Sequence, residues 1–318
     1  MADKIMLVSD VPNWAWHFKA KAIQKYLNDR FKKITVIHLK QFHKDLMGKY
    51  HTVLFFGWMD RRKIAGKYKG LVAGVSSHNF EYLHPEKARK YLPKYSAITG
   101  NSMLIYNKLK EWGLNKNIYY TPNGVDETIF YPNPVKHDKF RVGWIGQPSG
   151  NGFNRTDGID MHGYHNILLP LVDSLKNEKD IEFDIMAKTH KNARSFNEMP
   201  EYYNSLDLYL HTGFGTGTPN TAFEAQACGI PVIGTAIGAL PELITEKNGY
   251  LVPRFYNAKD AKERVDQIRD LILLARHKEP LIEKVMKENA RKIIVDNWTW
   301  KKCAEAYVPV LTKHRKVI

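Results

Sequence analysis

Short apolar, β-branched runs alternate along the chain with stretches in which apolar residues recur at helical spacing. In the stretch 18–30, for example, Ile23 and Leu27 share a face that lies opposite polar residues. Alternation of this kind predicts βαβ units and therefore a parallel sheet covered by helices. The apolar runs of the first half predict strands at 4–9, 34–39, 53–56, 71–75 and 118–120.

A polar break interrupts this alternation at 130–134, where two prolines and an asparagine disfavour both helix and strand. The pattern then restarts, with strands expected at 140–146, 181–186 and 206–210 and a helix at 166–175. We therefore expect an α/β chain built from two similar halves. The expected parts are a first domain over 1–131, a linker over 132–139, a second domain over 140–296 and a C-terminal helix over 297–318 that packs back on the first domain.

The two halves of the chain differ strongly in net charge. The chain has 48 basic and 33 acidic residues, a net charge of +15. Residues 1–139 hold 24 basic and 11 acidic side chains, whereas residues 140–318 hold 24 and 22. A basic first half predicts an anionic partner, such as nucleic acid, an acidic lipid surface or a phosphorylated glycan. The alternative is a solvated basic surface that maintains solubility.

The apolar segments and the cysteines indicate in which cellular compartment we expect the protein. No run of eighteen apolar residues occurs, and the start of the chain leads directly into a short strand instead of a signal-peptide core. We expect a cytoplasmic protein, in a bacterial host cell if it is viral. Cys228 and Cys303 lack the close spacing of a metal or redox motif, so we expect two small buried hydrophobes and no metal site.

A glycine-rich loop follows the expected strand at 206–210. Gly213, Gly215 and Gly217 allow the backbone to approach a ligand closely, Thr218 can cap a helix, and Pro219 suits a first helical turn. The free amides of a helix start form a site for phosphate. A tight turn without a ligand remains the alternative.

Several segments in a fixed order give this loop a wider context, and together they closely resemble the family 4 glycosyltransferases. The segments are Thr-Pro-Asn-Gly-Val-Asp at 121–126, Gly-Thr-Pro-Asn at 217–220, Glu-Ala-Gln-Ala-Cys-Gly-Ile-Pro-Val-Ile at 224–233, Gly-Ala-Leu-Pro-Glu-Leu-Ile at 238–244 and Asn-Gly-Tyr-Leu-Val at 248–252. The resemblance implies a GT-B fold, in which two Rossmann-like domains with parallel sheets face each other across a cleft. It also implies transfer of a hexose with retention from a UDP- or GDP-hexose co-substrate, with no cofactor or metal required.

At the donor, the resemblance implies that Glu224 is the second glutamate of a Glu-x7-Glu pair and holds the ribose hydroxyls. The chain departs from the family at Thr216, where the first glutamate would fall. It also departs at Gln147 and His162, where cations would hold the phosphates; Arg155, Lys188 and Lys191 could replace them. The full set expected at the donor is Gly146, Gln147, Arg155, His162, Lys188, Gly215, Thr216, Gly217, Thr218, Asn220 and Glu224.

In the first half, the resemblance places His78 in the active site, just after the strand 71–75, where a neutral imidazole could bond the sugar or the acceptor hydroxyl. His78 and Glu224 are the residues expected to be catalytic. Further acceptor candidates combine carboxylates, indoles that could stack on a sugar or base, and a basic run: Asp10, Trp14, Trp16, Arg61, Arg62, Lys63 and Glu81.

Three functions fit these observations. The first is a glycosyltransferase acting on DNA with hydroxymethylated pyrimidines, for which the basic run and the tryptophan loop could hold the backbone and a flipped base. The second is a membrane-surface enzyme acting on a lipid-linked or cell-envelope glycan. The third is a catalytically silent binding protein of the same fold, which the departures at Thr216, Gln147 and His162 would explain.

Overall fold

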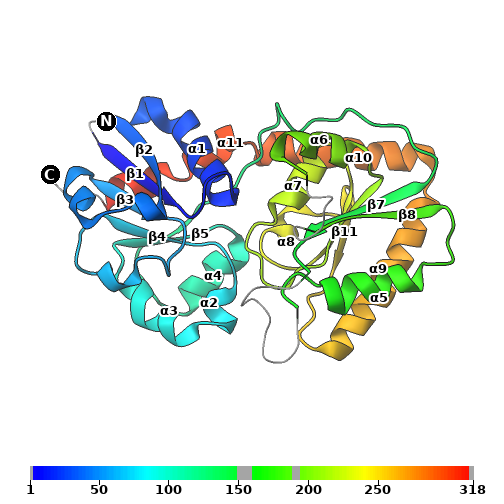
Figure 1. The fold of residues 1–318 in the computed structure, drawn as a ribbon, viewed down its shortest axis with the longest axis horizontal. Helices are drawn as coiled ribbons and strands as arrows, with labels where there is room; N and C mark the ends of the chain where they lie inside the picture. Colours follow the sequence, from blue (N-terminus) through cyan, green and yellow to red (C-terminus); the bar gives the residue numbers. More distant parts are fainter. Residues whose placement is uncertain (1–2, 149–159, 188–193, 315–318) are drawn as a thin grey trace. The chain divides into compact units, whose positions relative to one another are not determined.

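The computed structural model describes residues 3–148, 160–187 and 194–314 (Figure 1). The chain forms two compact units. The first runs to Gly124 and also takes in the chain from Trp298 onward, and the second is Val125–Asn297. The segment 132–139 lies within the second unit.

A parallel six-stranded sheet forms the centre of the first unit, in the order β2-β1-β3-β4-β5-β6. The order reverses next to β1, because the chain adds β2 on one side of β1 and β3 on the other. The strands are β1 (Lys4–Ser9), β2 (Lys33–His38), β3 (Thr52–Phe55), β4 (Leu71–Val75), β5 (Ala97–Gly100) and β6 (Ile118–Tyr120). In open parallel sheets, ligands bind beyond the carboxyl ends of the strands at such a reversal.

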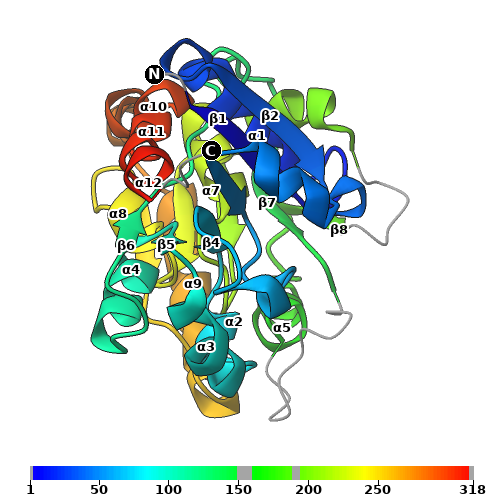
Figure 2. The ribbon, with the colours of Figure 1, turned by 90° about the vertical axis from the view of Figure 1, so that its left-hand side faces the viewer.

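Helices cover this sheet, and the end of the chain joins them. The Thr52 hydroxyl donates a hydrogen bond of 2.9 Å to the carbonyl of Leu311, and the Tyr307 phenol donates one of 3.2 Å to the carbonyl of Thr121. Figure 2 shows the C-terminal helices, in red, beside the first unit. The helices of the first unit are α1 (Ala15–Leu27), α2 (Asn79–Tyr82), α3 (Pro85–Tyr91), α4 (Met103–Glu111), α11 (Trp300–Glu305) and α12 (Val308–Lys313).

The second unit has a parallel five-stranded sheet in the order β11-β10-β9-β7-β8, which reverses between β7 and β9. Its strands are β7 (Phe140–Gly146), β8 (Ile181–Ala187), β9 (Leu208–His211), β10 (Val232–Thr235) and β11 (Gly249–Val252). Its helices are α5 (Leu169–Ser174), α6 (Met199–Asn204), α7 (Asn220–Ala227), α8 (Leu240–Leu243), α9 (Ala258–Arg276) and α10 (Pro280–Asn297). The expectation of two α/β halves with parallel sheets is confirmed.

Buried side chains fill each unit. The inner strands β1, β3, β4 and β5 are mostly apolar and buried, as parallel strands between helix layers must be, whereas β2 and β6, at the two edges of the sheet, are mostly only partly buried. The second unit buries a group of large aromatics, among them Trp144, Tyr202, Tyr203 and Tyr209. Within the described ranges, no helix combines the length and the apolar character needed to span a membrane.

Candidate functional site

The glycine loop of the second unit lies where its sheet reverses. Gly146 ends β7 and Gln147 follows it, while the loop begins just after β9. The Trp144 indole donates a hydrogen bond of 2.9 Å to the Thr212 hydroxyl, which in turn donates one of 2.8 Å to the carbonyl of His162. These bonds hold His162 beside the start of the loop, so the sheet edge and three expected donor residues come together.

Hydrogen bonds to backbone carbonyls hold the loop at both of its ends. The Thr235 hydroxyl donates to the carbonyl of Gly213 at 2.6 Å, and the amide of Ala239 donates to the carbonyl of Gly217 at 2.7 Å. One local expectation is wrong. Pro219, not Thr218, occupies the N-cap position of α7, and no side-chain cap bond forms there, because proline has no polar side-chain atom to accept one. Thr216, Gly217 and Thr218 therefore lead into α7 through a backbone-held turn.

Glu224 lies on the second turn of α7, and its carboxylate is bound to a tyrosine. The Tyr203 phenol donates a hydrogen bond of 2.8 Å to Oε2 of Glu224. Burial raises the pKa of Glu224 to about 7, an effect that the phenol bond partly offsets. The residue as a whole still keeps some exposed surface. The site thus holds a carboxyl group that changes charge near neutral pH. Tyr203 was not expected from the sequence.

Histidines and arginines supply the remaining polar chemistry of this edge. Burial, together with the nearby His162, lowers the pKa of His211 to about 3, so its ring stays neutral. Arg254, just beyond β11, donates a hydrogen bond of 2.8 Å to the carbonyl of Phe214 and lies 4.2 Å from the centre of the Phe214 ring. Arg254 follows β11 after one intervening proline, and no sequence motif marks it. The expected cations Arg155, Lys188 and Lys191 lie outside the described residues.

In the first unit, His78 and Glu81 form a pair beyond the end of β4. The His78 side chain is buried, with 3% of its residue surface exposed, and its Nδ1 lies 2.5 Å from Oε1 of Glu81. The two lie one helical turn apart, on and just before α2, which brings them into contact. A carboxylate at Nδ1 fixes the tautomer and orientation of an imidazole.

Two carboxyl groups meet where the first sheet reverses. Asp10 follows β1, and Asp60 lies in the loop after the neighbouring strand β3. Burial, together with the charge of Asp10, raises the pKa of Asp60 to about 6. An added Cβ on Gly57 would lie 2.5 Å from Oδ2 of Asp60 and 2.8 Å from the Trp16 ring, so these groups pack closely. Trp14, two residues before Trp16 in the sequence, is 53% exposed. Asp60 was not among the expected residues.

The basic run 61–63 is divided between anchored and free side chains. Arg61 donates to the carbonyl of Leu39 at 3.3 Å, and Arg62 donates to the carbonyl of Met59 at 2.9 Å. Lys63 is exposed. Backbone carbonyls therefore hold two of the three cations against their own unit.

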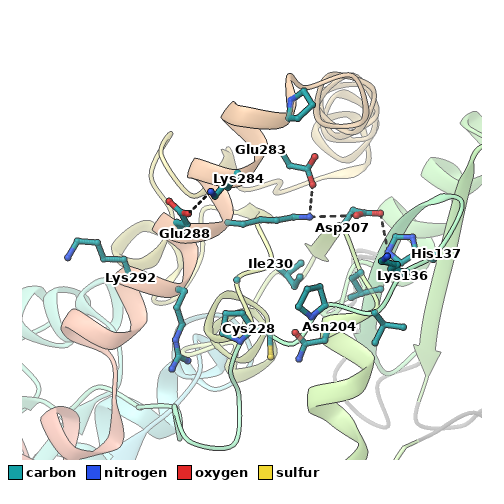
Figure 3. Close-up of a pocket in the computed structure, with 18 of the residues that line it drawn as sticks. Lys136, His137, Asn204, Asp207, Cys228, Ile230, Glu283, Lys284, Glu288 and Lys292 are labelled. Carbon is teal, nitrogen blue, oxygen red and sulfur yellow. Dashed lines mark ion pairs between the residues drawn. The ribbon is translucent and has the colours of Figure 1, made fainter.

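A separate hollow of about 1120 Å³ lies in the second unit, between α10 and the segment 132–138 (Figure 3). Its charges are largely paired: Lys287 lies 2.5 Å from Glu283 and 3.8 Å from Asp207, and Lys284 lies 4.0 Å from Glu288. None of the described residues expected at the donor is among those that line it. It is therefore distinct from the glycine loop.

Part of the second unit is similar to a known protein family. Residues 175–273, which include the loop, Glu224 and Tyr203, match the family described as "Glycosyl transferases group 1". The match covers less than a third of the chain, and over that part the chain is similar to group 1 glycosyltransferases. The expected resemblance to family 4 glycosyltransferases is confirmed, and the likeness to solved structures over nearly the whole chain confirms the GT-B fold.

Individual relatives of the chain are distant. The chain is 23% identical over 95% of its length to a probable sucrose-phosphate synthase of Thermosipho melanesiensis. It is 29% identical over 54% of its length to a GDP-mannose-dependent alpha-mannosyltransferase of Corynebacterium glutamicum. It spans 66% and 43% of the lengths of these two relatives, which is less than two thirds.

Among solved structures, Anabaena Alr3699/HepE in complex with UDP and glucose is similar, with a TM-score of 0.67 and 14% identity. The likeness covers 98% of this chain and all of that one. In the part of the chain that the structure describes, no cluster of His, Cys, Asp or Glu side chains could hold a metal ion.

Proposed function

We propose that the chain is a retaining hexosyltransferase that takes its sugar from a UDP- or GDP-hexose. The observation that carries the proposal is the placement of Glu224 and the glycine loop at the reversal of the second sheet, the position where such sheets bind nucleotides. Two similar proteins support a nucleotide-sugar donor: one similar structure contains UDP and glucose, and one relative is GDP-mannose-dependent.

The second unit would hold the donor through its backbone and one carboxylate. Amides of the loop at Gly215 and Gly217 and at the start of α7 would face the diphosphate, where charge grows as the glycosidic bond breaks. A carboxylate at Glu224 can accept two hydroxyl hydrogen bonds from a ribose. Retention would follow a front-face path in which the leaving phosphate helps to deprotonate the acceptor. No protein nucleophile is then needed.

The first unit would hold the acceptor, and its charge favours an anionic one. His78, oriented by Glu81, would bond a hydroxyl of the acceptor or sugar, and the group Asp10, Trp16 and Asp60 lies at the matching reversal of the first sheet. The two relatives are named for sucrose-phosphate synthesis and for mannosyl transfer, and neither name refers to DNA. We therefore favour a phosphorylated carbohydrate, free or part of a cell-envelope glycan. Hydroxymethylated DNA as the acceptor stays a prediction, which the experiment below includes.

The test supplies radiolabelled UDP-glucose or GDP-mannose to the protein with sugar phosphates, lipid extracts or hydroxymethylated DNA, and follows which pool takes up label. Glu224→Ala, which removes the ribose ligand, should lose nearly all transfer and donor hydrolysis. Label in DNA alone would overturn the carbohydrate proposal. Absence of both transfer and hydrolysis with every donor would indicate a silent binding protein instead.

A further inference from the structure

Tyr203 occupies an enclosed position between α6 and the sheet of the second unit. Its residue surface is 0% exposed, and its ring packs against Phe130, Tyr202 and Tyr209, with centres 6.0, 5.5 and 5.8 Å apart. A buried phenol usually has a hydrogen-bond partner for its hydroxyl, because leaving it without one costs free energy. Here the partner is Glu224, the group that the proposed function assigns to the donor.

Their hydrogen bond makes the two carboxyl oxygens of Glu224 different, because it engages only one of them. The phenol occupies one site on Oε2 at 2.8 Å, which leaves Oε1 and the remaining lone pair of Oε2 for another donor. Since Tyr203 is locked by packing, the bond also fixes the side-chain rotamer of Glu224. A ligand that donates two hydroxyl groups would then meet a carboxylate already in place.

We propose that Tyr203 is a positioning residue, which holds the Glu224 carboxyl group in the orientation that receives the ribose hydroxyls of the donor. This inference rests on the proposed function, because it takes Glu224 as the ribose ligand. It goes further by assigning a role to a residue on another helix, 21 positions away in sequence.

The protonation of Glu224 provides a measurable quantity that a purely structural role of Tyr203 would not change. Burial holds the pKa of Glu224 near 7, and the phenol bond lowers it. The pKa of Tyr203 is raised well above its usual value, first by burial and then by the charge of Glu224, so the phenol remains a donor. Other titratable groups around Glu224 are Tyr209, Cys228 and, through Cys228, Arg291; burial raises the pKa of the Cys228 thiol to about 12, so it stays neutral. Between pH 6 and 8, Glu224 is the member of this group that changes charge.

The experiment measures the affinity of the full chain for UDP-glucose, and in a second series for GDP-mannose, from pH 5.5 to 9. Both diphosphates are esterified at each end and do not titrate in this range. For the wild-type protein, affinity should rise with pH through about 7, because the carboxylate accepts two hydroxyl bonds and the carboxylic acid does not. Tyr203→Phe should move the midpoint upward by roughly one pH unit and weaken binding at pH 7 by about tenfold.

A matched control comes from the neighbouring residue on α6. Tyr202 is equally buried, but its phenol donates to the carbonyl of Asp184 at 2.8 Å, away from Glu224. Tyr202→Phe should therefore lose similar thermal stability without moving the midpoint. If Tyr203→Phe does not fold, wild-type protein labelled with 3-fluorotyrosine, a stronger hydrogen-bond donor, should show a lower midpoint than unlabelled protein.

The outcomes separate the two proposals. A pH dependence that Glu224→Gln abolishes but Tyr203→Phe leaves in place would overturn the role of Tyr203 and keep the donor site. Binding that is equally strong and equally pH-dependent in Glu224→Gln would overturn the assignment of Glu224 itself. No binding of either nucleotide sugar at any pH would overturn the proposed function, and the role of Tyr203 with it.

Discussion

An added Cβ on Gly238 would lie 1.9 Å from the carbonyl oxygen of Gly217, so the end of the glycine loop touches the turn before α8. The same oxygen accepts the hydrogen bond from Ala239. Gly238 has a φ of +50°, a region that side chains rarely adopt. The shape of the loop is thus set by a turn more than twenty residues beyond its first glycine.

Gly238→Ala should therefore destabilise the second unit by at least about 3 kcal/mol, since it combines backbone strain with a clash against another backbone segment. Gly229→Ala is the control, because its φ is +79° but its nearest contact would be an ordinary 3.4 Å. That variant should lose only about 1 kcal/mol. Urea unfolding and UDP-glucose binding measure both; equal losses in the two variants would contradict the contact.

The buried carboxyl group of Glu224 should make the second unit less stable as pH rises. A carboxyl group whose pKa is raised on folding, from 4.5 to about 7, binds more protons in the native state than in the unfolded state. Its stabilising contribution is complete below about pH 4.5 and is lost as pH rises to 7, by up to about 3 kcal/mol. Glu224→Gln, which resembles the protonated form, should flatten this part of the pH–stability curve. A curve unchanged by the substitution would show that Glu224 is not the group responsible.

Lys19 should reduce the stability of the first unit at neutral pH and below. Its residue surface is 3% exposed, and its ammonium group lies 5.2 and 5.5 Å from the centres of the Phe56 and Tyr307 rings. Burial lowers the pKa of Lys19 to about 7, so the unfolded state binds the proton more strongly and stability rises with pH from about 7 to above 10.

Lys19→Met should raise the free energy of unfolding at pH 6 by roughly 2 kcal/mol or more, because it removes a charge that is costly to bury. Lys40→Met, at an exposed position of the same unit, should change it by less than about 0.5 kcal/mol. Chemical denaturation at pH 6 and pH 10 separates the effects. A stabilisation by Lys19→Met that is as large at pH 10 as at pH 6 would point to packing instead of charge.

Much of the fold follows from local sequence patterns. The strands expected at 4–9, 71–75, 118–120 and 140–146 coincide with β1, β4, β6 and β7, because each apolar run ends at polar or turn-forming residues. The strand β5 was missed, since Ile98 is its only large apolar residue and it ends in a glycine; β10 and β11 were not among the expected strands either. The helix expected from residue 18 begins at Ala15 and ends at Leu27; its start carries no side-chain cap, so no sequence signal marked it.

The site could be predicted only where its residues follow a contiguous motif. Glu224 and the glycine loop lie within one such stretch. Tyr203 and Arg254 do not, because they reach the site only when α6 and the end of β11 pack beside α7 and the loop. Asp60 likewise meets Asp10 through the pairing of β1 with β3. Contacts of this kind depend on tertiary structure, and nothing in the local sequence distinguishes these residues from ordinary ones.

The pair of His78 and Glu81 gives the last prediction, which concerns turnover. Glu81→Gln keeps the size of the side chain but removes the negative charge that favours a protonated, oriented Nδ1. If His78 bonds the reacting groups through its other nitrogen, kcat should fall about tenfold with little change in donor affinity or stability. Glu86→Gln, at an exposed position on the neighbouring α3, is the matched control and should leave kcat unchanged. A rate of the chemical step, measured in a single turnover, that stays within twofold of wild type for Glu81→Gln would contradict this role and leave only the packing of α2 to the pair.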